Sequence, residues 1–163
     1  MPIPPPQGPY ATLPPGTHAC TLQEMHAMFV VGAPFTSERQ RIFDAFAVWM
    51  GHMSDLVPGC HVWVDGGYVT HKTWAAPKDV DVVIVVRPSQ YNALTPAQLA
   101  RFESLMTDRT GPAGQPMGGL VDAFLGLRGD PSLPSWRVFW ANVSDSDGSP
   151  VDNETKGFLE VTT

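Results

Sequence analysis

Two aspartates separated by a single residue are the feature of this 163-residue chain that most clearly points to chemistry. Asp79 and Asp81 open the run Asp-Val-Asp-Val-Val-Ile-Val-Val over 79–86, whose β-branched residues predict a buried central strand. Side chains alternate between the two faces of a strand, so both carboxylates should project from the same face. Carboxylates this close repel each other, and a divalent cation such as Mg²⁺ or Mn²⁺ relieves that repulsion. Such a pair can bridge two ions.

A pair of glycines precedes the aspartates, with eleven residues between them. Gly66 and Gly67 follow the alternating run His-Val-Trp-Val-Asp over 61–65, which predicts a second, shorter strand. Glycine has no Cβ, so its backbone amide can approach a ligand closely, and a helical turn after it would aim N–H groups at a phosphate. If the two predicted strands are neighbours, the glycines and the aspartates together form a site for a nucleoside triphosphate.

Further polar residues flank this predicted pocket. Asp122 lies in a third candidate strand over 120–125, and Lys72 and Lys78 could neutralise a triphosphate. Each also has a plainer interpretation. The acids can be solvated at strand ends, the glycines can form a simple turn, and the lysines can be loop residues in water.

The elements that must position these residues predict an α+β (mixed α/β) fold, with a small mixed sheet flanked by helices. Residues 1–16 are rich in proline and predict an extended arm, and 17–163 predict a single domain. A capping box at Thr21 predicts a short helix, and an N-cap at Thr36 or Ser37 begins the strongest helical pattern in the chain.

The second half of the chain gives mixed signals. Thr95 followed by proline predicts another helix, and 157–161 predict a last strand. Residues 134–140 fit a helix or a strand equally well. The polar, acidic stretch 144–154 predicts a surface loop.

The two motifs together resemble the signature of the DNA polymerase β-like nucleotidyltransferase superfamily. That signature is a hydrophobic residue, glycine, glycine or serine, a spacer, then an acid, a hydrophobic residue and a second acid. More of the chain is similar to a small, uncharacterised bacterial and phage family of minimal nucleotidyltransferase-like proteins. The matching segments are 13–18, 63–70, Lys72, 77–81 and 156–157, so the resemblance extends over nearly the whole chain after the arm.

The resemblance implies a nucleotidyltransferase fold, two bound Mg²⁺ or Mn²⁺ ions, and transfer of a nucleoside monophosphate from an NTP. Asp79 and Asp81 match the two metal-binding acids, and Asp122 matches a third carboxylate that helps activate the attacking hydroxyl. Gly66, Gly67, Lys72 and Lys78 would then contact the nucleotide. Gly67 stands where many relatives have serine, so only backbone contacts to phosphate would remain there. Many larger relatives also carry a helical substrate-binding domain, for which this chain has no room.

Composition narrows the function classes. Lys and Arg number 10 against 16 Asp and Glu, a net charge of −6, which argues against bulk nucleic-acid binding. No apolar run approaches the roughly 20 residues that span a bilayer. Two cysteines and an N-terminus without a basic, apolar leader lead us to expect a cytoplasmic protein.

Three hypotheses follow. The first is a metal-dependent nucleotidyltransferase that modifies a hydroxyl of RNA, such as a tRNA end, or of a protein. The second is a catalytically silent domain of the same fold that binds nucleotide or a partner protein, for example in toxin–antitoxin or phage–host interplay. The third is an interaction module that uses the Pro-rich arm for docking.

Overall fold

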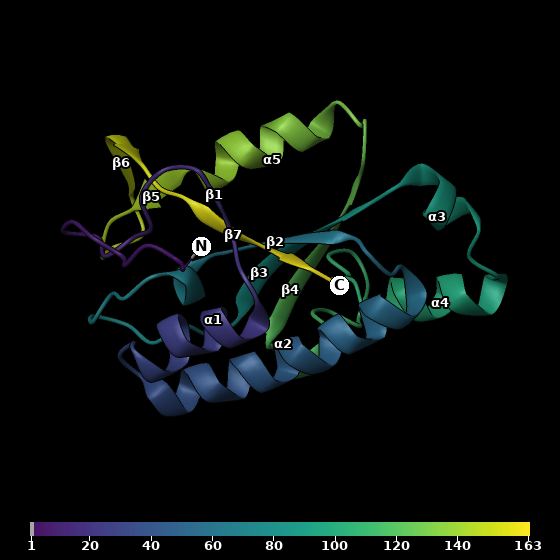
Figure 1. Cartoon of the computed structure of the whole chain (residues 1–163), viewed down its shortest axis with the longest axis horizontal. Helices are drawn as coiled ribbons and strands as arrows, with labels where there is room; N and C mark the ends of the chain where they lie inside the picture. Colours follow the sequence, from purple (N-terminus) through teal and green to yellow (C-terminus); the bar gives the residue numbers. More distant parts are fainter. Residues whose placement is uncertain (1) are drawn as a thin grey trace.

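The computed structural model describes residues 2–163 and has a mixed five-stranded sheet at its centre (Figure 1). The strand order is β1-β7-β2-β3-β4, and a separate two-stranded sheet pairs β5 with β6. β2 is antiparallel to both of its neighbours, whereas β1 with β7 and β3 with β4 are parallel pairs. The strands are β1 (Thr17–Ala19), β2 (His61–Asp65), β3 (Val80–Val86), β4 (Val121–Leu127), β5 (Asn142–Ser144), β6 (Pro150–Thr155) and β7 (Phe158–Thr162).

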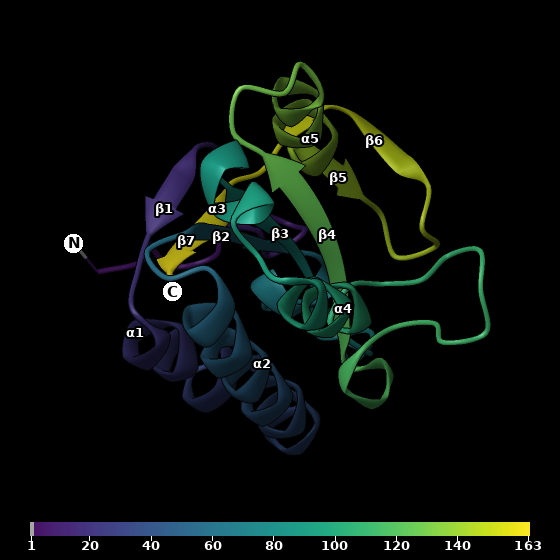
Figure 2. The same ribbon diagram turned by 90° about the vertical axis from the view of Figure 1, so that its right-hand side faces the viewer.

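Helices cover both faces of this sheet. They are α1 (Leu22–His26), α2 (Thr36–Leu56), α3 (Pro88–Asn92), α4 (Pro96–Ser104) and α5 (Ser132–Trp140), with a π-helical turn at Ala27–Val31 and 3₁₀ turns at Gly67–Val69 and Met117–Gly119. Figure 2 shows α1, α2 and α4 on one side of the sheet and α5 on the other. The α+β class expected from the sequence is confirmed.

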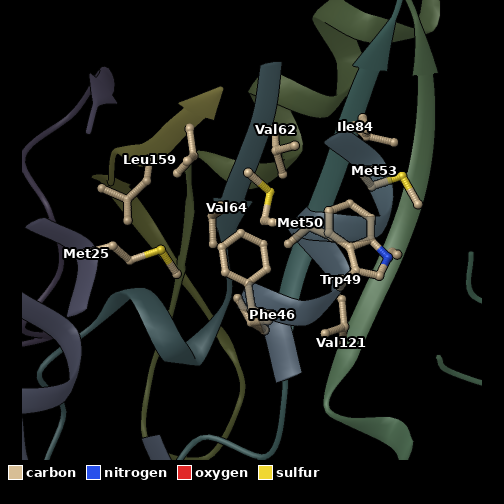
Figure 3. Packing of buried hydrophobic residues seen from close by; sticks show 14 of the residues in the cluster. Met25, Phe46, Trp49, Met50, Met53, Val62, Val64, Ile84, Val121 and Leu159 are labelled. Atoms are coloured by element: carbon tan, nitrogen blue, oxygen red, sulfur yellow. The ribbon is translucent and has the colours of Figure 1, made fainter. Parts of the chain in front are cut away.

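Two hydrophobic clusters fill the spaces between these layers. In the larger one, Phe46 and Trp49 of α2 pack on Val62, Ile84 and other inward-facing strand residues (Figure 3). The smaller cluster packs Trp140 of α5 against the opposite face, where the residues alternating with those of the first cluster emerge. Burial on both faces accounts for the continuous β-branched run of β3.

Short sequence motifs account for where several of the helices begin. The Thr21–Glu24 capping box opens α1, and a second capping box, Thr95–Gln98, opens α4. Residues 134–140, which fitted a helix or a strand, belong to α5. The expected N-cap of the long helix was wrong, because Phe35 precedes it in a left-handed conformation, φ 63°, and makes no side-chain cap.

The expected loop over 144–154 was also wrong, because much of it forms the β5–β6 hairpin around a turn at 145–149. β6 is exposed along most of its length, so no apolar alternation marked it in the sequence.

The Pro-rich segment lies against the rest of the chain. Ile3 and Leu13 belong to the larger hydrophobic cluster. The Leu13 carbonyl accepts a hydrogen bond from the Gly157 amide, and the Ala11 carbonyl accepts one from the His71 amide. The arm therefore forms part of the wall around the segment that follows β2.

A fully buried arginine on α2 anchors that same segment. The Arg39 guanidinium donates to the carbonyls of Pro34 at 2.7 Å, Phe29 at 3.2 Å, Tyr68 at 2.6 Å and Thr70 at 2.6 Å. Burial lowers the pKa of Arg39, but a guanidinium stays protonated in proteins. Five fixed donors make arginine suited to joining separate backbone segments.

Replacing this arginine should therefore be costly. We expect Arg39→Leu to lower the free energy of unfolding by roughly 3 kcal/mol or more, because it leaves buried carbonyls without donors. Urea unfolding measures this, and Arg41→Leu is the matched control, since Arg41 is exposed on the same helix. Equal stability of the two variants would contradict the anchoring role.

Candidate functional site

Three buried or half-buried aspartates lie side by side on three adjacent strands. In the sheet register Asp65 of β2 pairs with Asp81 of β3, and Asp81 pairs with Asp122 of β4. Their alternating neighbours Trp63 and Val83 belong to the hydrophobic cluster under α5, so the three carboxylates share that face of the sheet. We call Asp65, Asp81 and Asp122 the acid row.

Negative charge accumulates at the middle of the acid row. Burial, together with the carboxylates of Asp79, Asp122 and Asp65, raises the pKa of Asp81 to about 7, while Lys156 opposes this rise. The charges of four acidic groups thus interact here. Asp79, which lies just before β3, accepts a hydrogen bond from the Gln115 side chain at 3.0 Å.

An ion pair closes the β2 end of the acid row. Asp65 accepts a short hydrogen bond from the Lys156 ammonium, and only 12% of the Lys156 side chain is exposed. Burial raises the pKa of Asp65 to about 6, although the Lys156 charge and the Gly66 amide favour the ionised form. Lys156 lies between β6 and β7, and its own amide donates to the Ala141 carbonyl. This pair therefore joins the β5–β6 hairpin to the central sheet.

The other end of the acid row is held by polar partners. Asp122 accepts hydrogen bonds from the Thr107 hydroxyl at 2.7 Å and from the Arg109 guanidinium at 3.1 Å. The Arg109 guanidinium also lies 4.6 Å from the centre of the Phe124 ring. Because 63% of the Arg109 side chain is exposed, this cation can move away without breaking the core.

The chain turns sharply beside Asp81 at Gly66 and Gly67, which we call the glycine corner. Gly66 has φ +82°, and a Cβ there would lie 1.8 Å from Asp81 Oδ2. A Cβ on Gly67 would lie 3.0 Å from Lys72 Nζ. Gly66 is therefore required both by its backbone conformation and by the close approach to a carboxylate, whereas Gly67 lies in tight contact with an ammonium. The 3₁₀ turn Gly67–Val69 follows at once.

We expect Gly66→Ala to destabilise the protein by about 2 kcal/mol or more, because it combines left-handed strain with a clash against Asp81. Gly51→Ala on the exposed face of α2 is the control. A Cβ there meets nothing within 4 Å, so that change should raise stability by about 0.5–1 kcal/mol. Thermal unfolding of both variants measures the difference, and a harmless Gly66→Ala would contradict the proximity of Asp81.

The glycine corner and two members of the acid row open into a cavity of about 460 Å³. Its ionic end contains Asp65, Asp81, Lys72 and Lys156 beside the glycines. Burial lowers the pKa of Lys72, and the charges of Arg39 and Lys156 lower it further. In Figure 1 the arm, the segment after β2 and the β5–β6 hairpin gather at the end of the sheet where β2 ends and β3 begins.

The predicted site residues divide into two groups. Gly66, Gly67, Lys72 and Asp81 line the cavity. Asp79 and Asp122 lie beside Asp81 but are not among the residues that line it, and Lys78 is exposed and outside it.

Sequence reasoning missed Asp65 and Lys156 as site residues. The only local signals were an acid immediately before the glycines and a Lys-Gly pair before the last strand.

The acid row has the donors that Mg²⁺ prefers, namely carboxylate oxygens in excess over nearby cations. Within residues 2–163, however, no three His, Cys, Asp or Glu side chains are gathered around a point where a metal ion could bind. Asp65, Asp79 and Asp122 direct oxygens to Lys156, Gln115 and Arg109 instead. The donor chemistry thus fits a divalent ion, while ligation would require side-chain rotations away from these partners.

The fold and the site together describe an α+β protein in which the acid row lies beside the glycine corner. Residues 5–162 match a family of unknown function, DUF6932, and the chain belongs to that family. No curated protein and no solved structure matches it. In the part of the chain described, 2–163, every helix is too short or too polar to cross a membrane.

Proposed function

We propose that this protein is a metal-dependent nucleotidyltransferase that transfers a nucleoside monophosphate from an NTP to a hydroxyl group. The observation that carries the proposal is the acid row, which places Asp81 between two further aspartates on adjacent strands and directly against the glycine corner. The resemblance of the glycine and aspartate motifs to the polymerase β-like superfamily supports the same reaction. Reactions of this class depend mainly on positioning and on neutralising phosphate charge.

The residues of the chain would divide the work as follows. Asp79, Asp81 and Asp122 would hold two Mg²⁺ or Mn²⁺ ions, which supply positive charge to the phosphates and the attacking oxygen. Lys72 and Lys156 line the cavity where a triphosphate would lie. The acceptor oxygen attacks the α-phosphorus, its proton passes to Asp122, and the bond to the β-phosphate breaks to release pyrophosphate.

The acceptor hydroxyl belongs to an RNA or to a protein. An RNA acceptor needs basic residues gathered on one face, and Arg39 is withdrawn from any such face by burial. Together with a net charge of −6, this favours a protein acceptor or partner. We propose a cytoplasmic location as well, since NTPs and Mg²⁺ are abundant there.

One observation favours a silent, nucleotide-binding domain as the second candidate. Lys156 and Arg109 already engage the outer two carboxylates of the acid row, and a cation fixed in this way can substitute for a metal ion electrostatically. In that case nucleotide would bind without transfer.

Incubation with each α-³²P-labelled NTP, Mg²⁺ or Mn²⁺, total tRNA and host protein extract tests the proposal. We expect label to appear on one acceptor class, with no transfer from γ-³²P-labelled NTP, because pyrophosphate leaves. Nucleotide binding without transfer would favour the silent domain, and transfer that survives the double change Asp79→Asn and Asp81→Asn would contradict the proposed site.

A further inference from the structure

Part of the wall of the cavity is aromatic. Tyr10 of the arm, Trp74 of the segment after β2, and Phe139 and Trp140 of α5 all line it. We call these four side chains the aromatic rim. They come from three separate parts of the chain, so the fold, and not local sequence, brings them around one cavity.

Two members of the aromatic rim are unusually exposed. Phe139 is 66% exposed and Trp74 is 42% exposed, and they are the two aromatic residues among the large hydrophobic side chains left exposed within residues 2–163. Both of them line the cavity, and exposed aromatic side chains at a cavity indicate a binding site more than a folding requirement.

Phe139 is held in position although it is exposed. Its ring meets Trp136 edge to face at a centroid distance of 6.4 Å, and Trp136 meets the ring of Trp140 in the same way at 5.9 Å. Trp140 is buried and packs against Phe158 of β7 at 6.0 Å. A chain of aromatic contacts therefore fixes an exposed ring at the cavity, which lowers the entropy lost on stacking a ligand.

The lining of the cavity thus combines two kinds of chemistry. Lysines, aspartates and the glycine corner supply charges and backbone amides, and the aromatic rim supplies flat rings, with Asn142, Ser144 and Thr12 also among the lining residues. We propose that the aromatic rim, through Trp74 and Phe139, binds the base of a nucleotide whose phosphates lie at the ionic end. This inference rests on the proposed function and assigns the part of the substrate that the acid row does not hold.

The test separates base binding from phosphate binding. Calorimetric titrations with Mg²⁺ complexes of ATP, GTP, CTP and UTP are compared with inorganic tripolyphosphate, which has no base. We expect Trp74→Leu and Phe139→Leu each to weaken binding of the preferred NTP about 5- to 150-fold, the range for loss of one aromatic–base stack. Tripolyphosphate affinity should change less than about twofold.

Two controls accompany these variants. Trp74→Phe keeps a ring and should retain most of the NTP affinity. Val138→Ala removes an exposed apolar side chain from the same helix without touching the cavity, so it should leave both ligands unaffected.

The outcomes distinguish this inference from the proposed function. If the rim variants bind NTP and tripolyphosphate as the wild type does, base stacking is overturned while the phosphate site stands. Equal loss of both ligands would also overturn it, because the rim would then act on the phosphates or on folding. If the wild type binds neither ligand, the proposed function fails and this inference fails with it.

Discussion

Asp81→Asn should abolish transfer and, at the same time, make the metal-free protein more stable above pH 7. Transfer should fall by at least about 10³-fold, because an amide in place of the carboxylate removes the central member of the acid row. The gain in stability follows from the pKa of Asp81, which is about 7 in the folded protein against an ordinary value of 3.8. Loss of activity together with a gain in stability is the result expected when a functional residue is held in an unfavourable charge environment.

The sign of the stability effect follows from proton linkage. Between about pH 4 and pH 7 the folded protein retains a proton on Asp81 that the unfolded chain has lost, so the free energy of unfolding falls as the pH rises through this interval. Asparagine has no such proton and avoids the loss. Above pH 7 the variant should exceed the wild type by up to about 4 kcal/mol, and near pH 4 the two should be nearly equal.

Urea unfolding between pH 4 and pH 8.5, with EDTA present, measures this difference. Asp152→Asn is the matched control because it makes the same change in charge at an exposed position on β6. It should shift stability by less than about 0.5 kcal/mol at every pH. A variant at Asp81 that is less stable than the wild type at pH 8 would show that the carboxylates do not repel one another as described.

Lys156→Met should be the most damaging single change at alkaline pH. It leaves Asp65, of which 3% is exposed, as a buried charge without its cation, and such changes cost about 3–5 kcal/mol. Loss of the ammonium also removes an interaction that favours ionised Asp65, so the pKa of Asp65 should rise above its present value of about 6. The cost should therefore grow with pH and be smaller near pH 5, where Asp65 takes up a proton.

A double-mutant cycle isolates this ion pair. The variant carrying both Asp65→Asn and Lys156→Met has no buried charge at this position and should recover most of the lost stability. Lys78→Met serves as the control, since Lys78 is exposed, and should change stability by less than about 0.5 kcal/mol. A loss below about 1 kcal/mol for Lys156→Met at pH 8 would contradict the importance of the pair.

Local patterns were enough to predict most of the fold. The β-branched run of β3, the alternation of β2 and the capping box of α1 are each contained in a few consecutive residues. β6 could not be predicted in this way, because both of its faces meet water and its residues carry no alternation.

Only about half of the site residues could be predicted from the sequence, for a related reason. Asp79 and Asp81 can be recognised from their spacing at the start of β3, and the glycines from their position just after β2. Asp65 and Lys156 are 91 residues apart in sequence, and only the sheet register and the closing strand bring them together. Trp74 was missed because an isolated tryptophan in a loop has no periodicity to indicate what it lines.

The most direct test of the central claim, that Asp79, Asp81 and Asp122 hold divalent ions together with a nucleotide, is a titration with Mn²⁺ followed by electron paramagnetic resonance of the free ion. It uses the preferred NTP as its α,β-methylene analogue, which cannot react. The account predicts that the wild-type protein takes up two Mn²⁺ ions in the presence of the analogue and that Asp81→Asn weakens this uptake at least about 10-fold. Equal Mn²⁺ uptake by the wild type and Asp81→Asn would contradict it.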